Sequence, residues 1–400
     1  MKRIFAVGVS VFLGLASDLA SAKVAASPAT WLLSSDFSVS RKPAKSVDAT
    51  LVNISFKDDL IALSEFRQTY QHLSDKAFQE KLEGSLERDL MFFRSFVNTY
   101  YQDLAQNVSS SSLVLCLGDA HPENFGFMSI SGQTVYVFND LDDSGVCPIE
   151  FDILRYFASV ELAFQDRGLL EKAALEYSQV LSGKKLARHL DSSLVPNLKK
   201  RREKILRRYT HAGAFKESED YVLMSESEKK TWLTNLKDLP VFARVQLLDI
   251  VKIHRTTGGS GGLQRYWLLS QKDNVQEILE LKEFHKAGTS YGTWEQPRWD
   301  ATERLSKIKK YIWGQSPEFY DIASVGNTIF LVRSRTKDSL DLGELSKKEL
   351  ESVMLVQAGI LAAHHKQFAK QGIAEVEKWI LANAPRVVER YRKSLQQLKP

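Results

Sequence analysis

Residues 113–126 read LVLCLGDAHPENFG, and the rest of the chain is organised around this segment. Its first five residues are apolar, which is the pattern of a short buried strand, and Gly118 ends the run before a polar loop. A second apolar run at Val135–Phe138 follows a glycine-containing turn and also ends in acidic residues. Two adjacent strands are therefore expected to bring four polar side chains to one end of a sheet, those of Asp119, Asn124, Asp140 and Asp142.

These residue types suit phosphoryl transfer. Mg²⁺ is usually held by one or two carboxylates together with substrate phosphates. The transfer itself needs a metal and a group that orients the attacking hydroxyl. Asp119 suits the orienting base, while Asn124 and Asp140 suit the metal, with Asp142 as a further ligand candidate. Asp and Asn also cap turns, and this alternative stays open for each residue taken alone.

A resemblance to known enzymes rests on residues 118–124, GDAHPEN. They resemble the Gly-Asp-x-His-x-x-Asn catalytic loop of aminoglycoside phosphotransferases and choline-kinase-like enzymes. Asp140 matches the metal-binding Asp of those enzymes, and Asp152 matches an Asp that opens their next helix. More closely, the chain resembles an uncharacterised bacterial family, domain of unknown function 2252, from about residue 85 onward. The resemblance implies an α+β, protein-kinase-like fold with two lobes.

A glycine-rich turn forms the second informative region. The turn is Gly258, Gly259, Ser260, Gly261 and Gly262. Its backbone N–H groups could approach phosphates closely, and a flexible hairpin turn is the alternative. Lys282 follows in an apolar strand, where its charge needs a partner. Kinase-like folds hold ATP phosphates with such a turn and a strand lysine. Glu303, in a helix predicted over residues 300–311, is the first candidate partner of Lys282, and Glu295 is the second.

The order of these motifs is reversed relative to kinases, because the catalytic loop precedes the glycine-rich turn and the lysine. We therefore predict a circularly permuted kinase-like fold. Its parts are a signal peptide at 1–22, an N-terminal arm and first elements at 23–77, a large lobe at 78–239, a small sheet-rich lobe at 245–335, and C-terminal helices at 340–400 that pack on the large lobe.

The N-terminus predicts export. Lys2 and Arg3 precede an apolar run and Ala20-Ser21-Ala22, the pattern of a signal peptide cleaved after Ala22. An uncleaved anchor is the alternative, but the run is too short to span a bilayer comfortably. The mature protein is then periplasmic or secreted, without a membrane span. An oxidising compartment allows a disulfide between Cys116 and Cys147, and two buried thiols remain the alternative.

Charge gives weaker information. The net charge of +5 over 400 residues is mild and does not favour nucleic acid as a partner. The basic run at residues 199–208 predicts a solvated helix face, or a holder of an acidic partner. Arg94 could reach phosphate or form a surface ion pair. His364 and His365 are adjacent and so do not share a helix face, and a metal pair is not expected from them.

The combined prediction is an exported phosphotransferase. It would move the γ-phosphoryl group of ATP, with Mg²⁺, to a hydroxyl of an unknown small molecule or protein. An exported protein meets little ATP, so other functions stay open. One is a different transfer with the same donor, such as nucleotidyl transfer. Another is a catalytically idle kinase-like protein of the envelope that binds a ligand or partner. The third is a metal-dependent hydrolase that uses His121 as a ligand.

Overall fold

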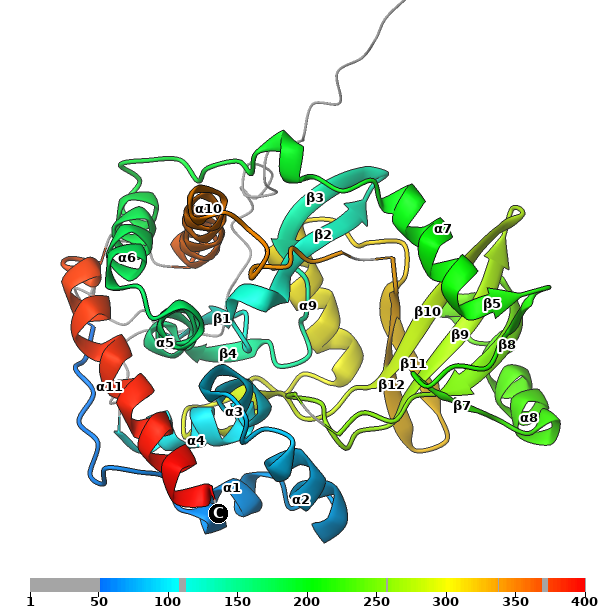
Figure 1. The fold of residues 1–400 in the computed structure, drawn as a ribbon, viewed down its shortest axis with the longest axis horizontal. Helices are drawn as coiled ribbons and strands as arrows, with labels where there is room; N and C mark the ends of the chain where they lie inside the picture. Colours follow the sequence, from blue (N-terminus) through cyan, green and yellow to red (C-terminus); the bar gives the residue numbers. More distant parts are fainter. Residues whose placement is uncertain (1–50, 108–112, 257, 337, 369–372, 400) are drawn as a thin grey trace, which may run out of the picture.

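Two bodies of different composition lie side by side in the computed structural model, a helix-rich body and a six-stranded antiparallel sheet (Figure 1). The structure describes residues 51–107, 113–256, 258–336, 338–368 and 373–399. The predicted signal peptide and residues 23–50 of the predicted arm lie outside these residues. The mixed α+β class agrees with the prediction. No helix among the described residues is both long enough and apolar enough to cross a membrane.

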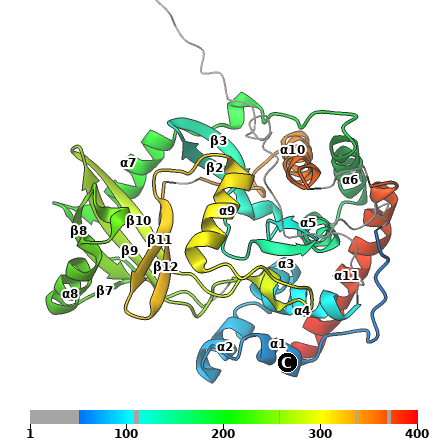
Figure 2. The same ribbon diagram turned by 180° about the vertical axis from the view of Figure 1, so that it is seen from behind.

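The sheet has the strand order β11-β12-β10-β9-β8-β7. Its strands are β7 (Val222–Leu223), β8 (Gln246–Lys252), β9 (Arg265–Lys272), β10 (Val275–Glu283), β11 (Tyr320–Val325) and β12 (Thr328–Ser334). A two-residue turn, Asp273-Asn274, joins β9 to β10, and both residues have positive φ (47° and 64°), as tight hairpin turns require. The glycine-rich turn joins β8 to β9. The helix α9 (Ala301–Trp313) links β10 to β11 and lies between the sheet and the helical body (Figure 2).

Each face of the sheet is covered by the preceding part of the chain. The helix α8 (Glu226–Lys237) supplies Leu236 to the apolar cluster on one face. On the other face, Tyr209 ends α7 (Leu198–Tyr209) and packs with Trp267, 5.0 Å between ring centroids. The short strands β5 (Thr210–His211) and β6 (Ala214–Phe215) complete this layer. Apolar side chains between residues 205 and 242 therefore pack on the sheet.

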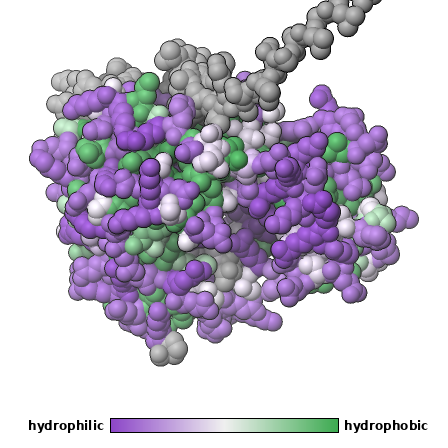
Figure 3. Space-filling model, turned by 45° about the horizontal axis from the view of Figure 1, so that its top comes forward, coloured by the Kyte–Doolittle hydropathy of each residue, from purple (hydrophilic) through white to green (hydrophobic). Residues whose placement is uncertain are grey.

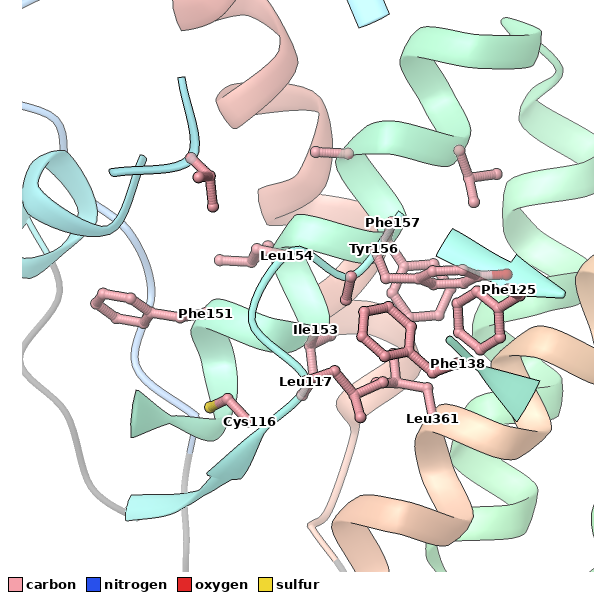
Figure 4. Close-up of a cluster of buried hydrophobic side chains, with 14 of the residues drawn as sticks. Cys116, Leu117, Phe125, Phe138, Phe151, Ile153, Leu154, Tyr156, Phe157 and Leu361 are labelled. Atoms are coloured by element: carbon pink, nitrogen blue, oxygen red, sulfur yellow. The ribbon is translucent and has the colours of Figure 1, made fainter. Parts of the chain in front are cut away.

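The helical body is built around α5 (Ile149–Phe164), whose residues 149–160 are all buried, including the charged side chains of Glu150, Asp152 and Arg155. Its helices are α1 (Leu63–Thr69), α2 (Asp75–Glu83), α3 (Asp89–Ser95), α4 (Val97–Asn107), α5 (Ile149–Phe164), α6 (Arg167–Leu181), α10 (Lys347–Lys366) and α11 (Val376–Leu398). Figure 4 shows Ile153, Tyr156 and Phe157 of α5 gathered with Leu117, Phe125, Phe138 and Leu361. The loops that carry the candidate site therefore rest on a packed core.

Strand pairing near these loops differs from the prediction. The strand β1 (Leu113–Cys116) pairs with β4 (Gly145–Pro148), and β2 (Phe125–Ile130) pairs with β3 (Gln133–Phe138). The two predicted strands thus belong to separate two-stranded ladders. Cys116 and Cys147 form a disulfide that ties β1 to β4, with their Cα atoms 5.8 Å apart.

Most predicted helices are present, but one is divided. The spacing of apolar residues from Phe78 to Leu104 predicts a single helix, and this prediction is wrong, because α2, α3 and α4 share the stretch. Gly84 caps α2, and Phe96 leaves the helical conformation between α3 and α4, with φ −118° and ψ 50°. The sequence also predicts a helix over about 171–190, and the structure has α6 there, which ends before Gly183, where φ is +75°.

Candidate functional site

A small pocket of about 50 Å³ lies where the loops of the helical body meet the sheet. Its walls are Arg94, Asp119, His121, Asn124, Asp140, Asp143, Arg255, Gly258, Gly259, Ser260, Arg265, Lys282 and Arg333. The pocket thus unites both predicted acidic loops, the glycine-rich turn and the strand lysine. Asp142 joins it through Lys282. Gly261 and Gly262 complete the turn further out, where Gly262 faces Leu73.

The loop after β1 is fixed by its backbone. Gly118 has φ +92°, and a Cβ there would lie 2.3 Å from the backbone carbonyl of Asp143, so a larger residue cannot fit. Asp152, at the start of α5, accepts the N–H groups of Leu117 (2.7 Å) and Gly118 (3.0 Å). Its carboxylate also lies 3.1 Å from Nε2 of His365. Asp152 therefore orients the loop, and His365 acts as its hydrogen-bonding partner.

Asp119 is held by a buried arginine. Its Oδ1 accepts hydrogen bonds from Nε (3.0 Å) and Nη2 (2.6 Å) of Arg155, which is fully buried in α5. Its Oδ2 lies 3.4 Å from Nε2 of His121. Burial raises the pKa of Asp119, but Arg155 and His121 more than offset it, and the pKa lies below the ordinary value. Asp119 therefore stays a carboxylate, which suits it to orient a hydroxyl.

Lys282 finds its partners across the pocket. Its Nζ forms an ion pair with Oδ2 of Asp142 and lies 3.6 Å from Oδ1 of Asp140. Burial lowers the pKa of Lys282 to about 8. Arg333 also reaches Asp140, with Nη1 at 2.9 Å from Oδ1. The prediction that a strand lysine needs a carboxylate is confirmed, but the carboxylates come from the loop after β3.

The predicted partners of Lys282 lie elsewhere. Glu303 is exposed in the first turn of α9, where its N–H donates to Oδ1 of Asp300. Glu295 is also exposed. The helix α9 instead presents Arg304 to the loop, and its Nη1 donates to the carbonyl oxygen of Asp142 at 2.9 Å. The prediction that Glu303 pairs with Lys282 is therefore wrong, because Asp142 and Asp140 take that place.

The donor set near the pocket fits a metal shared with phosphate. No group of three or more His, Cys, Asp or Glu side chains within the described residues is arranged to hold a metal ion alone. Asn124 donates its Nδ2 to the carbonyl oxygen of Asp119 (2.9 Å), which leaves its Oδ1 for a cation. Asp140 lines the same pocket, and Oδ1 of Asp142 is buried without a hydrogen-bond partner. Two such oxygens suit Mg²⁺ when phosphate and water supply the rest.

Lys81, which sequence reasoning missed, holds the glycine-rich turn. Its Nζ donates to the carbonyl oxygens of Gly258 and Gly259, the latter at 3.0 Å. The side chain is fully buried and lies over the ring of Tyr70, 4.9 Å from its centroid. A Cβ on Gly259 would lie 3.7 Å from Oδ2 of Asp119, so the turn passes directly over that carboxylate. Burial lowers the pKa of Lys81 to about 7.

Basic groups outnumber acidic groups around the pocket. The basic side chains are Arg94, Arg255, Arg265, Lys282 and Arg333, and the acidic ones are Asp119, Asp140 and Asp143. Arg94 reaches the pocket as the sequence allowed, with its Nε 3.1 Å from Nε2 of His121, and it also pairs with Glu123. Burial and the neighbouring carboxylate of Asp119 raise the pKa of Asp143 to about 7. At least four of the five basic side chains already form ion pairs, so an anionic ligand would replace carboxylates as their partner.

A larger cavity of about 780 Å³ shares no wall with this pocket. It lies between the β2–β3 hairpin, the start of α7 and the ends of β10 and β12. Figure 3 shows that the surface where the two bodies meet is largely hydrophilic. None of the predicted site residues lines this cavity, so the chemistry identifies the smaller pocket as the candidate site.

Comparison with protein families gives one match. Residues 76–184 and 184–391 match the family described as "Uncharacterized protein conserved in bacteria (DUF2252)". The search of curated proteins and the search of solved structures each found no match. The family match spans well over half of the chain and includes every side chain that lines the pocket. The chain therefore belongs to the bacterial DUF2252 family.

Proposed function

We propose that this protein is a phosphotransferase that moves a terminal phosphoryl group to a hydroxyl acceptor. The sequence predicts ATP as the donor and Mg²⁺ as the cofactor. The observation that carries the proposal is the meeting of four separate segments in one pocket. These segments are the loop with Asp119 and Asn124, the loop with Asp140, the glycine-rich turn, and the strand with Lys282.

The order of the sheet elements also supports a kinase-like fold. The glycine-rich turn joins β8 to β9, Lys282 lies on β10, which is the third strand when counted from β8, and the helix α9 follows. Kinases use a glycine-rich turn, a lysine on the third strand and a following helix in this order. The loop with Asp119 precedes these elements in the chain, which agrees with a permuted connection. The kinase-like fold is part of the proposal.

Each residue of the pocket has a separate role in the proposed phosphoryl transfer. Asp119 accepts a hydrogen bond from the acceptor hydroxyl and later its proton, and Arg155 fixes its carboxylate in place. Lys282 and Arg94 neutralise the phosphate oxygens. Asn124 and Asp140 would hold Mg²⁺, which neutralises charge that develops on the donor. The glycine-rich turn covers the phosphates, since Gly258, Gly259 and Ser260 line the pocket.

Donor consumption tests this proposal. The mature protein is incubated with Mg²⁺, a phosphate donor and an envelope extract as the acceptor source, and phosphorus NMR follows the donor. We expect Asp119→Asn to lower turnover about 10²- to 10⁴-fold, the range for loss of an acid–base group. Asn keeps the size of the side chain beside Arg155, which Ala would not. Glu303→Gln is the matched control. Unchanged turnover in Asp119→Asn would remove the mechanism.

A second candidate function is an idle kinase-like protein that binds a ligand or a partner. Two observations favour it: Arg155 already engages Asp119, and the glycine-rich turn lies over the same carboxylate. This protein would bind phosphate compounds without turning them over. Binding without donor loss, together with normal binding by Asp119→Asn, would support the second candidate.

Export remains part of the proposal. The predicted cleavage after Ala22 falls outside the described residues. The N-terminal residue of protein recovered from periplasm or medium tests it directly. Lys23 at the N-terminus is the expected result, and recovery of uncleaved chain from the cytoplasm would contradict export.

A further inference from the structure

The surroundings of the phosphate pocket bear on the choice of donor. A nucleotide carries its base and sugar well beyond its phosphates, and enclosed ligands bury most of their surface. A nucleotide donor therefore needs a second slot beside the phosphate pocket. Three sides of the pocket can be followed residue by residue, and the chain itself fills each of them.

The first side is closed beside Asn124. Gly126 follows two residues later, and a Cβ there would lie 2.3 Å from the carbonyl oxygen of Asp338 and 2.4 Å from Nδ2 of Asn139. Phe127 and Asp338 exchange two backbone hydrogen bonds, of 2.7 Å and 3.0 Å. The segment that leaves the sheet after β12 is thus paired directly with β2, and no ligand ring fits between them.

The second side is the sheet face around Lys282. Glu280 precedes Lys282 by two residues on the same face of β10 and is 1% exposed. Its carboxylate accepts a hydrogen bond from Nη1 of Arg265 (2.7 Å) and another from Nε of Arg333 (2.7 Å). This buried ion network occupies the face where a ligand would otherwise extend.

Further along the same face, aromatic side chains fill the space. Trp267 follows Arg265 by two residues on β9, and the guanidinium of Arg335 lies 4.5 Å from the centroid of its ring. Tyr209 and Tyr221 pack against Trp267, with centroid distances of 5.0 Å and 5.6 Å. Both tyrosines come from the segment around α7 that covers this face. The aromatic ring that could stack on a base is already in use.

The third side is the glycine-rich turn. Lys81 holds its carbonyl groups, and the N–H of Gly258 donates to Oγ of Ser95 at 3.3 Å. The remaining volume of about 50 Å³ is small.

From these three walls we infer that the phosphoryl donor is a condensed inorganic phosphate, such as pyrophosphate or tripolyphosphate, and not a nucleotide. This inference rests on the proposed function. The acceptor oxygen forms a bond to the terminal phosphorus, and the bridging P–O bond breaks. The shortened phosphate chain leaves with the electron pair of that bond, and the hydroxyl proton passes to Asp119. Arg94 and Arg255 line the same pocket and neutralise the added charge. A donor of this class removes the need for ATP outside the cytoplasm.

Calorimetric titration of the mature protein with Mg²⁺ tests the inference. The probes are tripolyphosphate, pyrophosphate, ATP and adenosine. We expect tripolyphosphate to bind at least tenfold more tightly than ATP, and millimolar adenosine to leave its affinity unchanged. Lys282→Met should weaken tripolyphosphate binding at least tenfold. Lys272→Met, which removes a partly exposed lysine at the far end of β9, should leave it unchanged.

The possible outcomes distinguish an error in the identity of the donor from an error in the proposed phosphotransferase function. Tighter binding of ATP than of tripolyphosphate, or competition by adenosine, overturns the inference and leaves the proposed phosphotransferase standing. Failure of every phosphate compound to bind overturns both. Phosphorus NMR gives a second readout, because the inferred reaction converts tripolyphosphate to pyrophosphate and leaves ATP unchanged over the same period.

Discussion

Asp119 and Lys282 face the same pocket, but their charges are balanced in different ways. Asp119 pairs with Arg155, and both residues belong to the helical body. Lys282 stands on the sheet and pairs with Asp142 and Asp140, which belong to the helical body. The first ion pair lies within one body, and the second joins the two bodies.

One ion pair thus depends on packing within one body, whereas the other depends on how the two bodies meet. A relative movement of the bodies would leave the Asp119 pair intact, because core packing around α5 holds both residues. The same movement would break the Lys282 pairs and free the lysine for a phosphate. We therefore expect mutations near Asp119 to affect stability most, and mutations at Lys282 to affect ligand binding most.

The largest expected effect comes from Arg155→Met. This change leaves the carboxylate of Asp119 buried without its partner, which costs about 3–5 kcal/mol of unfolding free energy. Urea denaturation measures it. Arg155→Met combined with Asp119→Leu removes both charges and should recover most of the loss. A loss below about 1 kcal/mol in the single variant would show that the pair does not fix the site.

Removal of the disulfide comes next. Cys116→Ala with Cys147→Ala opens a loop with a sequence separation of 31 residues, and a loop of this length predicts a loss of about 3–4 kcal/mol. The bond ties the strand before Asp119 to the strand before α5, so the part of the site around Asp119 should loosen. Hydrogen exchange of residues 113–118 measures the loosening. Unchanged exchange and unchanged stability would exclude a role for the bond.

Lys282→Met should cost less stability, about 1–3 kcal/mol, the range for a buried acceptor left without its partner. Arg333 still pairs with Asp140 in this variant, which limits the loss. Binding of phosphate compounds should fall much more, by at least tenfold. Equal losses in stability for Lys282→Met and Arg155→Met would break the distinction between the two pairs.

Lys81→Met should have a smaller effect that depends on pH. The pKa of Lys81 is lowered to about 7 from an ordinary value of 10.5, so the folded protein loses this proton before the unfolded chain does. Between pH 7 and 10 the unfolded state then binds more protons, and wild-type stability rises relative to Lys81→Met. A gain above about 1.4 kcal/mol, one pKa unit, is expected by denaturation across this range. A constant difference would show that the amine titrates normally.

The smallest effect is expected for Glu303→Gln. The side chain is exposed and lies away from the pocket, so stability should change by less than about 0.5 kcal/mol and phosphate binding should not change. Asp142→Asn makes the informative comparison, because it removes the observed partner of Lys282. If Glu303→Gln weakened phosphate binding more than Asp142→Asn does, Glu303 would be the functional partner of Lys282, as the sequence suggested.

Local patterns in the sequence predicted the elements well where periodicity was strong. The apolar runs before Asp119 and Asp140 are strands, the helix predicted over residues 300–311 is α9, and the C-terminal helices predicted at 340–400 are α10 and α11. The pairing of β1 with β4 was missed, because residues 145–148 are too few and end in proline. The division of the helix after Phe78 had a local signal at Gly84 but none at Phe96.

The contacts across the pocket were harder to predict, because they join distant segments. The sequence indicated that Lys282 needs a partner. The observed partner, Asp142, lies in the loop after β3 of the helical body, whereas Lys282 lies on the sheet. Arg155 had a weak signal as a charge within an apolar helix. Lys81 had none, since it is one of several charged residues in α2. The sequence predicts that a buried charge needs a partner of opposite charge. Which of several candidate residues becomes that partner depends on how distant segments pack in the folded chain.

The most direct test of the central claim is the unfolding free energy of the mature protein with a phosphate donor, with and without Mg²⁺. A ligand at a hundredfold excess over its dissociation constant raises this free energy by about 2.7 kcal/mol. The account predicts such a rise with tripolyphosphate, dependent on Mg²⁺ and lost in Asp140→Asn. No rise with tripolyphosphate, pyrophosphate or ATP, under either condition, would contradict a phosphate-binding pocket.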